Sequence, residues 1–303
     1  MNSLLDMYAK CGCMDDGFQV FSRFHDKDVV TWTTIISGYA RQGLDDKAFQ
    51  LLEEMRREGV NPDKFAFMCV LKACASVKSL EKGRLIHVYV VQSGLELDAF
   101  MVSTLVDFYS KCGHLTDARH AFDSIIDHDV VSWTAMLVAY AKHGCGQEAL
   151  ELMGKMLDSG VKLNHVTLLG VLSACSHSGM LEEGQYMFDI MKQKSMVTKT
   201  AEHYACMIDL LTRAGCLEAA EQLLTDLPFE PNVSMWLALL RSCIICGNRD
   251  LAKHAAEHVL KLEPGNEVAF VLLSNVCANG ASGIACDVMQ DDDWLSVNQL
   301  QVG

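Results

Sequence analysis

Two short motifs in the C-terminal third of the chain have the residue types and spacing to bind a metal ion. His254-Ala-Ala-Glu-His258 has the H-x-x-E-H order of a class of zinc peptidases, and Cys243-Ile-Ile-Cys246 has the spacing of half a zinc site. Both motifs fall within predicted helices, and the two cysteines have no second pair of ligands nearby. We therefore expect buried structural side chains at both places, with no metal, no cofactor and no catalytic residue.

A second set of polar residues recurs along the chain and has hydrogen-bonding groups that suit a nucleobase. A carboxylate accepts a hydrogen bond from the ring N–H of G or U, whereas an amide can donate to the ring nitrogen of A or C. The recurring residues are Asp28, Asp63, Asp98, Asp129, Asn164, Asn232 and Asn266. Any one of them is ordinarily a helix N-cap, so their recurrence is what indicates a binding role.

Polar residues inside the predicted helices accompany four of these positions. In the unit that ends at Asp63, the accompanying polar residue is Thr33. Val30 and Thr33 lie three residues apart and share a helix face, and Arg41 returns to that face about three turns after Val30. One surface therefore offers polar groups, a cation and an apolar shelf on which a base can pack. The shelf residues are Val30, Phe100 and Val131.

A basic residue stands two positions before a glycine in five places: Lys10, Arg41, Lys111, Lys142 and Arg213. A cation near a helix C-terminus interacts favourably with the helix dipole. A row of cations can also follow a phosphate backbone. The two roles are compatible, and we expect these side chains to face phosphates.

The elements that must position these residues are repeated. Asp28-Val-Val-Thr-Trp-Thr-Thr34 returns 101 residues later as Asp129-Val-Val-Ser-Trp-Thr-Ala135. Repetition at fixed spacing predicts a stacked array, not a globular enzyme. A glycine closes each helical stretch, except near Lys78, where the glycine is replaced. These glycines are Gly12, Gly43, Gly113, Gly144, Gly179, Gly215, Gly247 and Gly280.

Apolar residues at helical spacing between the glycines predict two helices in each unit. We therefore expect an all-α, right-handed superhelical solenoid of helix–turn–helix repeats. Trp32 and Trp133 point away from the inner Thr residues and should pack in its core. The predicted units are 1–28 (partial), 29–63, 64–98, 99–129, 130–164, 165–200, 201–232, 233–266 and 267–280, followed by a divergent tail at 281–303.

The composition limits the class of protein. The chain has 303 residues and a net charge of −14, which counts against a nucleic-acid binder because such proteins usually show a basic surface. Its 13 scattered cysteines are typical of reduced, buried thiols. It has no run of 18 apolar residues, so we expect no membrane span and no membrane partner.

The recurring strings together resemble the plant pentatricopeptide repeat family. They are Gly38-Tyr-Ala-Arg41, Glu54-Met-Arg-Arg-Glu-Gly-Val-Asn-Pro-Asp63, Leu71-Lys-Ala-Cys-Ala75 and Asp107-Phe-Tyr-Ser-Lys-Cys-Gly113. The alternation of units of 35, 35–36 and 31–32 residues is similar to the PLS subclass. The segments Glu202–Leu211, Leu262–Pro264 and Val271–Asn275 look like the end of such an array, with an E-type extension.

The resemblance implies a single-stranded RNA-binding protein of mitochondria or plastids that specifies sites for RNA processing or C-to-U editing. A zinc deaminase needs an H-x-E motif, and no His here is followed two residues later by Glu. We therefore expect no DYW deaminase domain, and a deaminase or accessory protein supplied in trans.

Carried over residue by residue, the family's pattern assigns a base to each complete pair. Asn2 with Asp28 resembles a U reader, and both Thr33 with Asp63 and Ser103 with Asp129 resemble G readers. Thr134 with Asn164 resembles an A reader. The remaining units lack a polar inner residue, as at Met68 and Leu169. The expected RNA sequence is 5′-UGNGANN-3′.

Two other interpretations stay open at this point. The concave groove of such a solenoid also suits a protein–protein scaffold, which the acidic net charge favours. A non-functional remnant is the other, because the chain begins partway into a unit, has only four informative bases and has a degraded tail. We also recognise no import peptide in these 303 residues.

Overall fold

The computed structural model describes residues 2–95, 97–193 and 198–278 of the chain. Within these ranges it contains 17 α-helices and no strand. The helices are α1 (Asn2–Cys11), α2 (Met14–Ser22), α3 (Val29–Arg41), α4 (Asp45–Arg57), α5 (Lys64–Ser76), α6 (Leu80–Gln92), α7 (Ala99–Lys111), α8 (Leu115–Asp123), α9 (Val130–Lys142), α10 (Gly146–Asp158), α11 (His165–Ser178), α12 (Leu181–Gln193), α13 (Ala201–Arg213), α14 (Leu217–Thr225), α15 (Val233–Cys246), α16 (Arg249–Leu262) and α17 (Glu267–Ala278).

Side-chain caps set the start of the first helix in several hairpins. The carboxylates of Asp28, Asp63, Asp98 and Asp129 each accept a hydrogen bond from the backbone N–H three residues later, at 2.8, 2.8, 3.0 and 2.9 Å. Asn232 caps α15 in the same way, at 3.0 Å. Each cap stabilises its helix by about 1 kcal/mol. The caps therefore place these carboxylates and amides at the same end of successive first helices.

A left-handed residue reverses the chain between the two helices of each hairpin. Gly113 has φ +82° between α7 and α8, a conformation that costs glycine little because it has no Cβ. Between α5 and α6, Lys78 adopts φ 55° instead. The expected replacement of the glycine near Lys78 is thus confirmed, and this non-glycine residue carries the turn at the cost of some backbone strain.

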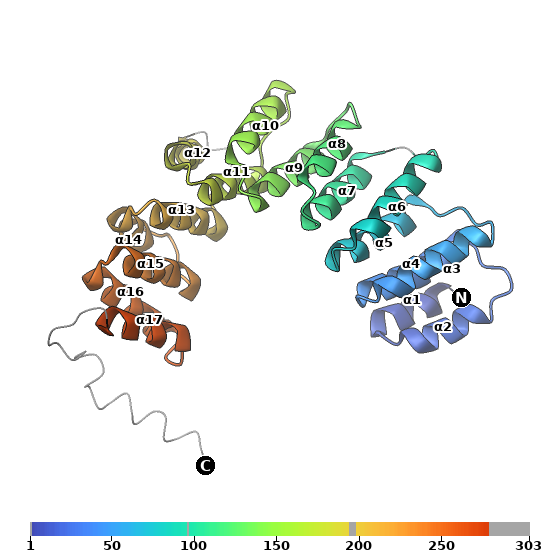
Figure 1. Cartoon of the computed structure of the whole chain (residues 1–303), viewed down its shortest axis with the longest axis horizontal. Helices are drawn as coiled ribbons and strands as arrows, with labels where there is room; N and C mark the ends of the chain where they lie inside the picture. Colours follow the sequence, from blue (N-terminus) through green and yellow to red (C-terminus); the bar gives the residue numbers. More distant parts are fainter. Residues whose placement is uncertain (1, 96, 194–197, 279–303) are drawn as a thin grey trace, which may run out of the picture. The chain divides into compact units, whose positions relative to one another are not determined.

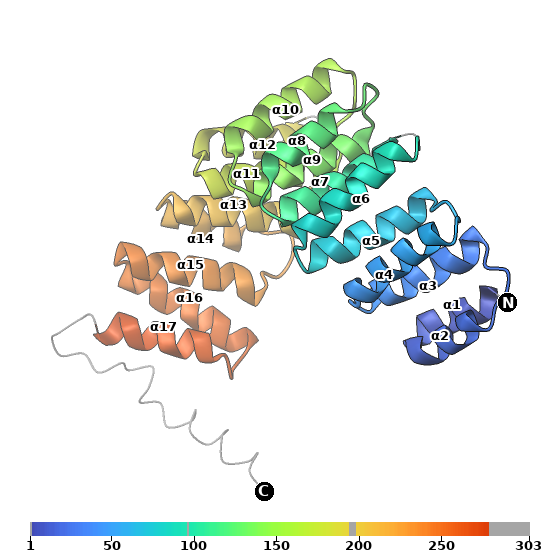
Figure 2. The same ribbon diagram turned by 45° about the vertical axis from the view of Figure 1, so that its right-hand side comes forward.

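The helices stack in sequence order within the first of two compact units, Met1–Ser178. In this unit α1 packs on α3, α3 on α5, α5 on α7, α7 on α9 and α9 on α11, so the first helices form a continuous row (Figure 1). The second helices pack beside them, each against its own first helix. Figure 2 shows the same row from another direction. This packing places all four predicted reading pairs along one row of helices.

The two tryptophans lie in the core of this unit, as the sequence predicted. Trp32 is fully buried with its ring 4.8 Å from that of Phe21 in an edge-on arrangement. Trp133 is 5% exposed and meets Phe122 edge-on at 5.1 Å. Such aromatic pairs add about 0.5–1.5 kcal/mol beyond the area that they bury. Neither ring is available to stack on a ligand.

The second unit spans Gly179–Gly303, and its described part contains α12 to α17. Here α15 packs on α13, α16 and α17. His258 stacks on Trp236 at 4.1 Å, and His254 Nδ1 lies 2.7 Å from Glu221 Oε1. Both histidines of the H-x-x-E-H motif therefore take part in packing between helices.

At the C-x-x-C motif Cys243 is buried, as predicted, but Cys246 is exposed, so the prediction of a buried thiol at that position is wrong. The described residues contain no group of three His, Cys, Asp or Glu side chains arranged to hold a metal. None of the described helices is long and apolar enough to cross a membrane. The predicted tail at 281–303 lies outside the described residues.

Candidate functional site

Of the four predicted pairs, one is in direct contact and one is bridged by a third residue, at the ends of the first helices. Thr33, on α3, donates its hydroxyl to Asp63 Oδ1 at 3.2 Å. The buried Thr31 hydroxyl lies 2.5 Å from Asp28 Oδ1 and 3.1 Å from Asn2 Oδ1, so it links the residues of the first pair. The hydrogen bond from Thr31 is the main cause that lowers the pKa of Asp28, and Asn2 adds a smaller contribution. Asp28 therefore stays ionised and acts as a hydrogen-bond acceptor.

In the other two pairs the inner hydroxyl is bound to its own helix. Ser103 donates to the carbonyl of Phe100 at 2.9 Å, and Thr134 donates to the carbonyl of Val130 at 2.6 Å. Their oxygens keep lone pairs that can accept a further hydrogen bond. Asn164 accepts the backbone N–H of Thr167 at 2.9 Å through Oδ1. That bond leaves the Asn164 side-chain NH₂ as a donor.

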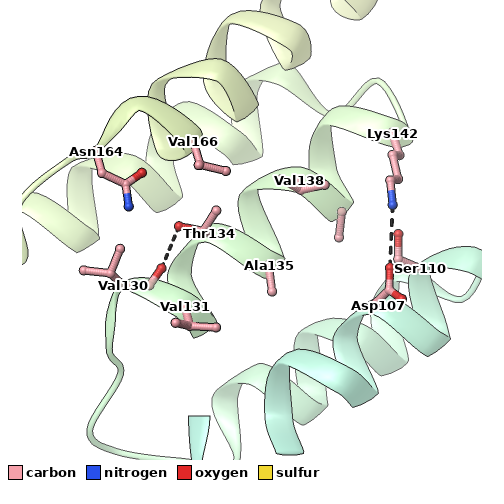
Figure 3. Close-up of a pocket in the computed structure, with 11 residues that line it drawn as sticks. Asp107, Ser110, Val130, Val131, Thr134, Ala135, Val138, Lys142, Asn164 and Val166 are labelled. Atoms are coloured by element: carbon pink, nitrogen blue, oxygen red, sulfur yellow. Dashed lines mark hydrogen bonds and ion pairs between the residues drawn. The ribbon is translucent and has the colours of Figure 1, made fainter. Parts of the chain in front are cut away.

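Thr134 and Asn164 line one pocket, which lies between α7, α9 and the start of α11, all within the first unit. The pocket has a volume of about 380 Å³. Its walls are mainly apolar, and Val131 and Val166 are exposed on it. Figure 3 shows Thr134 and Asn164 facing the same space from neighbouring elements, with Lys142 at the far end. The pocket thus combines an apolar shelf, a hydrogen-bond donor and acceptor, and a cation.

Large apolar side chains are exposed at the second position of successive first helices. The predicted shelf residues Val30, Phe100 and Val131 are 57%, 57% and 42% exposed. Two more residues of this set, which the sequence reading missed, are Phe65 at 60% and Val166 at 37%. Both stand two positions after a unit-ending residue, and that spacing was the signal that could have found them. Exposure of large apolar groups at equivalent places indicates a binding surface.

Most of the predicted phosphate-facing cations have an acidic partner one helical turn earlier. Lys10 pairs with Asp6 at 2.6 Å, Lys111 with Asp107 at 2.7 Å, and Arg213 with Asp209 at 2.8 Å. The i, i+4 spacing of each pair is visible in the sequence and is typical of ion pairs on one helix face. Three of the five cations are therefore partly neutralised by their own helix.

Asp107 also contacts a cation of the next hairpin. Its Oδ1 lies 3.6 Å from Lys142 Nζ, while its Oδ2 binds Lys111. All three side chains are 37–49% exposed. Arg41 has no acidic partner within ion-pair distance among the described residues. The net positive charge that these five residues offer to a ligand is thus smaller than their number suggests.

Comparison with known proteins identifies the same repeat along most of the chain. A profile described as "PPR repeat family" matches residues 27–76 and 128–177, and one described as "PPR repeat" matches 1–29, 166–196 and 202–228. The chain is 40% identical over 280 residues to the Arabidopsis thaliana pentatricopeptide repeat-containing protein CRR2, chloroplastic, and covers 43% of it. It is 39% identical over 277 residues to a second Arabidopsis thaliana protein, the pentatricopeptide repeat-containing protein At1g06140, mitochondrial, and covers 50% of that protein.

A solved structure shows the same fold. The pentatricopeptide repeat protein PPR10, in complex with an 18-nt psaJ RNA element, superposes with a TM-score of 0.74 at 20% sequence identity. The match covers 91% of this chain and 44% of that protein. The all-α helical-repeat solenoid predicted from the sequence is therefore confirmed. The chain spans half or less of the length of the curated relatives described above.

Proposed function

Because the chain belongs to the pentatricopeptide repeat family, we propose that it binds single-stranded RNA sequence-specifically. Helical repeats of this kind read one base each with two or three side chains. The observation that carries the proposal is the pocket at α9. There Thr134, Asn164 and the apolar pair Val131 and Val166 line one pocket of about 380 Å³.

The pocket's chemistry supports selection of adenine at the fifth position. A base between Val131 and Val166 is packed on both faces by apolar side chains. The free side-chain NH₂ of Asn164 can donate to the adenine ring nitrogen, and the lone pairs of Thr134 can accept from a base edge. Lys142 at the end of the pocket can approach a phosphate as a point charge.

The same reasoning assigns the other complete pairs. Asn2 with Asp28 reads U, Thr33 with Asp63 reads G, and Ser103 with Asp129 reads G. Asp63 supports this assignment, because only its Oδ1 is engaged by Thr33 and Ala66 and its Oδ2 is open to a ring N–H. The proposed recognition sequence is 5′-UGNGANN-3′, in which successive nucleotides correspond to the units that end at residues 28, 63, 98, 129, 164, 200 and 232.

We further propose an organellar role in RNA processing or C-to-U editing, as a specificity factor without its own catalysis. The chloroplastic and mitochondrial relatives support the location. The alternation of unit lengths supports the PLS subclass, with 233–266 and 267–280 as E-like repeats. In an editing reaction the deaminase would then come from another protein.

RNA binding by the 303-residue chain tests the proposal. A fluorescently labelled RNA with UGNGA at its centre should bind more tightly than a scrambled RNA of equal composition, both measured at one stated salt concentration. An extended peptide library serves as the comparison ligand. Equal affinity for the two RNAs, or binding of peptides alone, would reject RNA recognition in favour of a protein–protein scaffold.

A further inference from the structure

One of the four aspartate caps differs from the others in how its second oxygen is used. Asp63 and Asp129 each accept two hydrogen bonds through Oδ1, and the Oδ2 atom of each has no protein partner among the described residues. In Asp98, Oδ1 accepts the Met101 N–H at 3.0 Å, and Oδ2 binds Lys64 Nζ at 2.5 Å. The Asp98 carboxylate is therefore engaged on both sides before any ligand arrives.

The partner of Asp98 comes from the preceding hairpin. Lys64 is the first residue of α5, and its side chain spans from the start of that helix to the cap of α7. The equivalent first residues Val29, Ala99 and Val130 are apolar, so they cannot form this bond. The ammonium group of Lys64 is the main cause that lowers the pKa of Asp98. Among the caps Asp63, Asp98, Asp129 and Asn164, only Asp98 therefore has a charged contact of this kind.

The apolar part of the same site is intact. Phe65 and Phe100, the exposed residues at the second position of α5 and α7, are 60% and 57% exposed. They correspond to Val131 and Val166 in the α9 pocket, and each offers a larger aromatic face. Stacking on aromatic rings is tolerant of base identity because every base has a π-face.

We propose that Lys64 masks Asp98, so that the third nucleotide of the recognition sequence is held by stacking at Phe65 and Phe100 without selection of its base. A ring N–H offered to Asp98 meets an oxygen already bound by a charged donor, which is the stronger type of hydrogen bond. Lys64 is therefore a specificity-determining residue that suppresses reading. This inference rests on the proposed RNA recognition.

Substitution of Lys64 tests the masking directly. The full chain is assayed against four RNAs that differ only at the third nucleotide of UGNGA. Wild type should bind all four within about twofold. Lys64→Ala should prefer G and U over A and C by roughly fivefold, the effect of one hydrogen bond. Adding Met68→Thr to Lys64→Ala should sharpen the preference toward G, whereas Met68→Thr alone should leave the four RNAs equal.

Lys72→Ala is the matched control, because it removes the same charge from the same helix at an exposed residue that makes no ion pair with any other described residue. The inference is overturned if Lys64→Ala leaves the four RNAs equal, or if Met68→Thr alone creates the preference. It is also overturned if Lys64→Ala weakens binding of all four RNAs uniformly and lowers the salt dependence, because Lys64 is then a phosphate contact.

The second and fifth nucleotides of the RNA are varied in parallel experiments. If wild type selects no base at these two nucleotides, the proposed RNA recognition is rejected. If wild type selects bases at both and Lys64→Ala does not change selection at the third nucleotide, only the masking by Lys64 is rejected.

Discussion

The substitution Asn164→Asp exchanges a hydrogen-bond donor for an acceptor inside the α9 pocket and changes little else. Asn164 Oδ1 caps α11 through the Thr167 N–H, and an aspartate oxygen caps a helix equally well. The side-chain NH₂ becomes a carboxylate oxygen, which accepts from the ring N–H of G but cannot donate to the ring nitrogen of A. We expect the preferred fifth base to switch from A to G.

The size of the switch follows from one base-edge contact. Such a contact discriminates by about 1–3 kcal/mol, and 1.4 kcal/mol corresponds to a tenfold ratio of affinities. Wild type should therefore favour A over G by about tenfold or more, and the variant should reverse that ratio. The thermal stability of the variant should match that of wild type, since its helix cap is retained.

Fluorescence anisotropy with RNAs that differ only at the fifth base of UGNGA measures the switch. Asn232→Asp is the control, because Asn232 also caps a first helix but has no polar inner partner. It should leave the preference for A unchanged. Uniform weakening of all RNAs by Asn164→Asp, or a change at another position, would refute the reading of bases by pairs.

Two further predictions concern charge and packing. Asp107→Asn frees Lys111 and Lys142, so it should tighten binding to every RNA and steepen the plot of log affinity against log salt by up to about 0.7 per gained phosphate contact. The control is Asp123→Asn, which breaks the ion pair with Arg119 on the second helix α8 and should have neither effect. If the slope of log affinity against log salt is unchanged in both variants, Lys111 and Lys142 do not contact phosphates. Gly83→Ala should destabilise the fold by about 1–3 kcal/mol, because its Cβ would lie 1.9 Å from the buried Phe108 Cζ. The control is Gly154→Ala in α10, where the added Cβ meets nothing within 4 Å; it should raise the free energy of unfolding by about 0.5–1 kcal/mol in denaturant. Equal stability of the two variants would contradict the close packing of α6 on α7.

The repeat made the fold predictable because each hairpin buries its apolar face only against its neighbours. The 101-residue offset, and the glycines that close the helices, predicted a stack of helical hairpins, including the reversal at Lys78. The core positions of Trp32 and Trp133 followed from helical spacing alone. These features depend on local sequence and on one repeating contact.

The contacts between hairpins were less predictable. The Thr33 hydroxyl reaches Asp63, yet the Thr134 hydroxyl bonds to its own helix, although both residues occupy equivalent places. The bond from Lys64 to Asp98 spans 34 residues and depends on the path of a long side chain. Such choices are decided by packing across neighbouring hairpins, which sequence spacing does not show.

Selection from a randomised RNA library tests the proposed recognition sequence without assuming any of its bases. The chain is incubated with RNAs that carry a random segment, and the bound fraction is sequenced after several rounds. We expect an enriched core of U, G, any base, G and A in that order from the 5′ end. A bound fraction with no enriched core, or a core in which these four bases appear in another order, would contradict it.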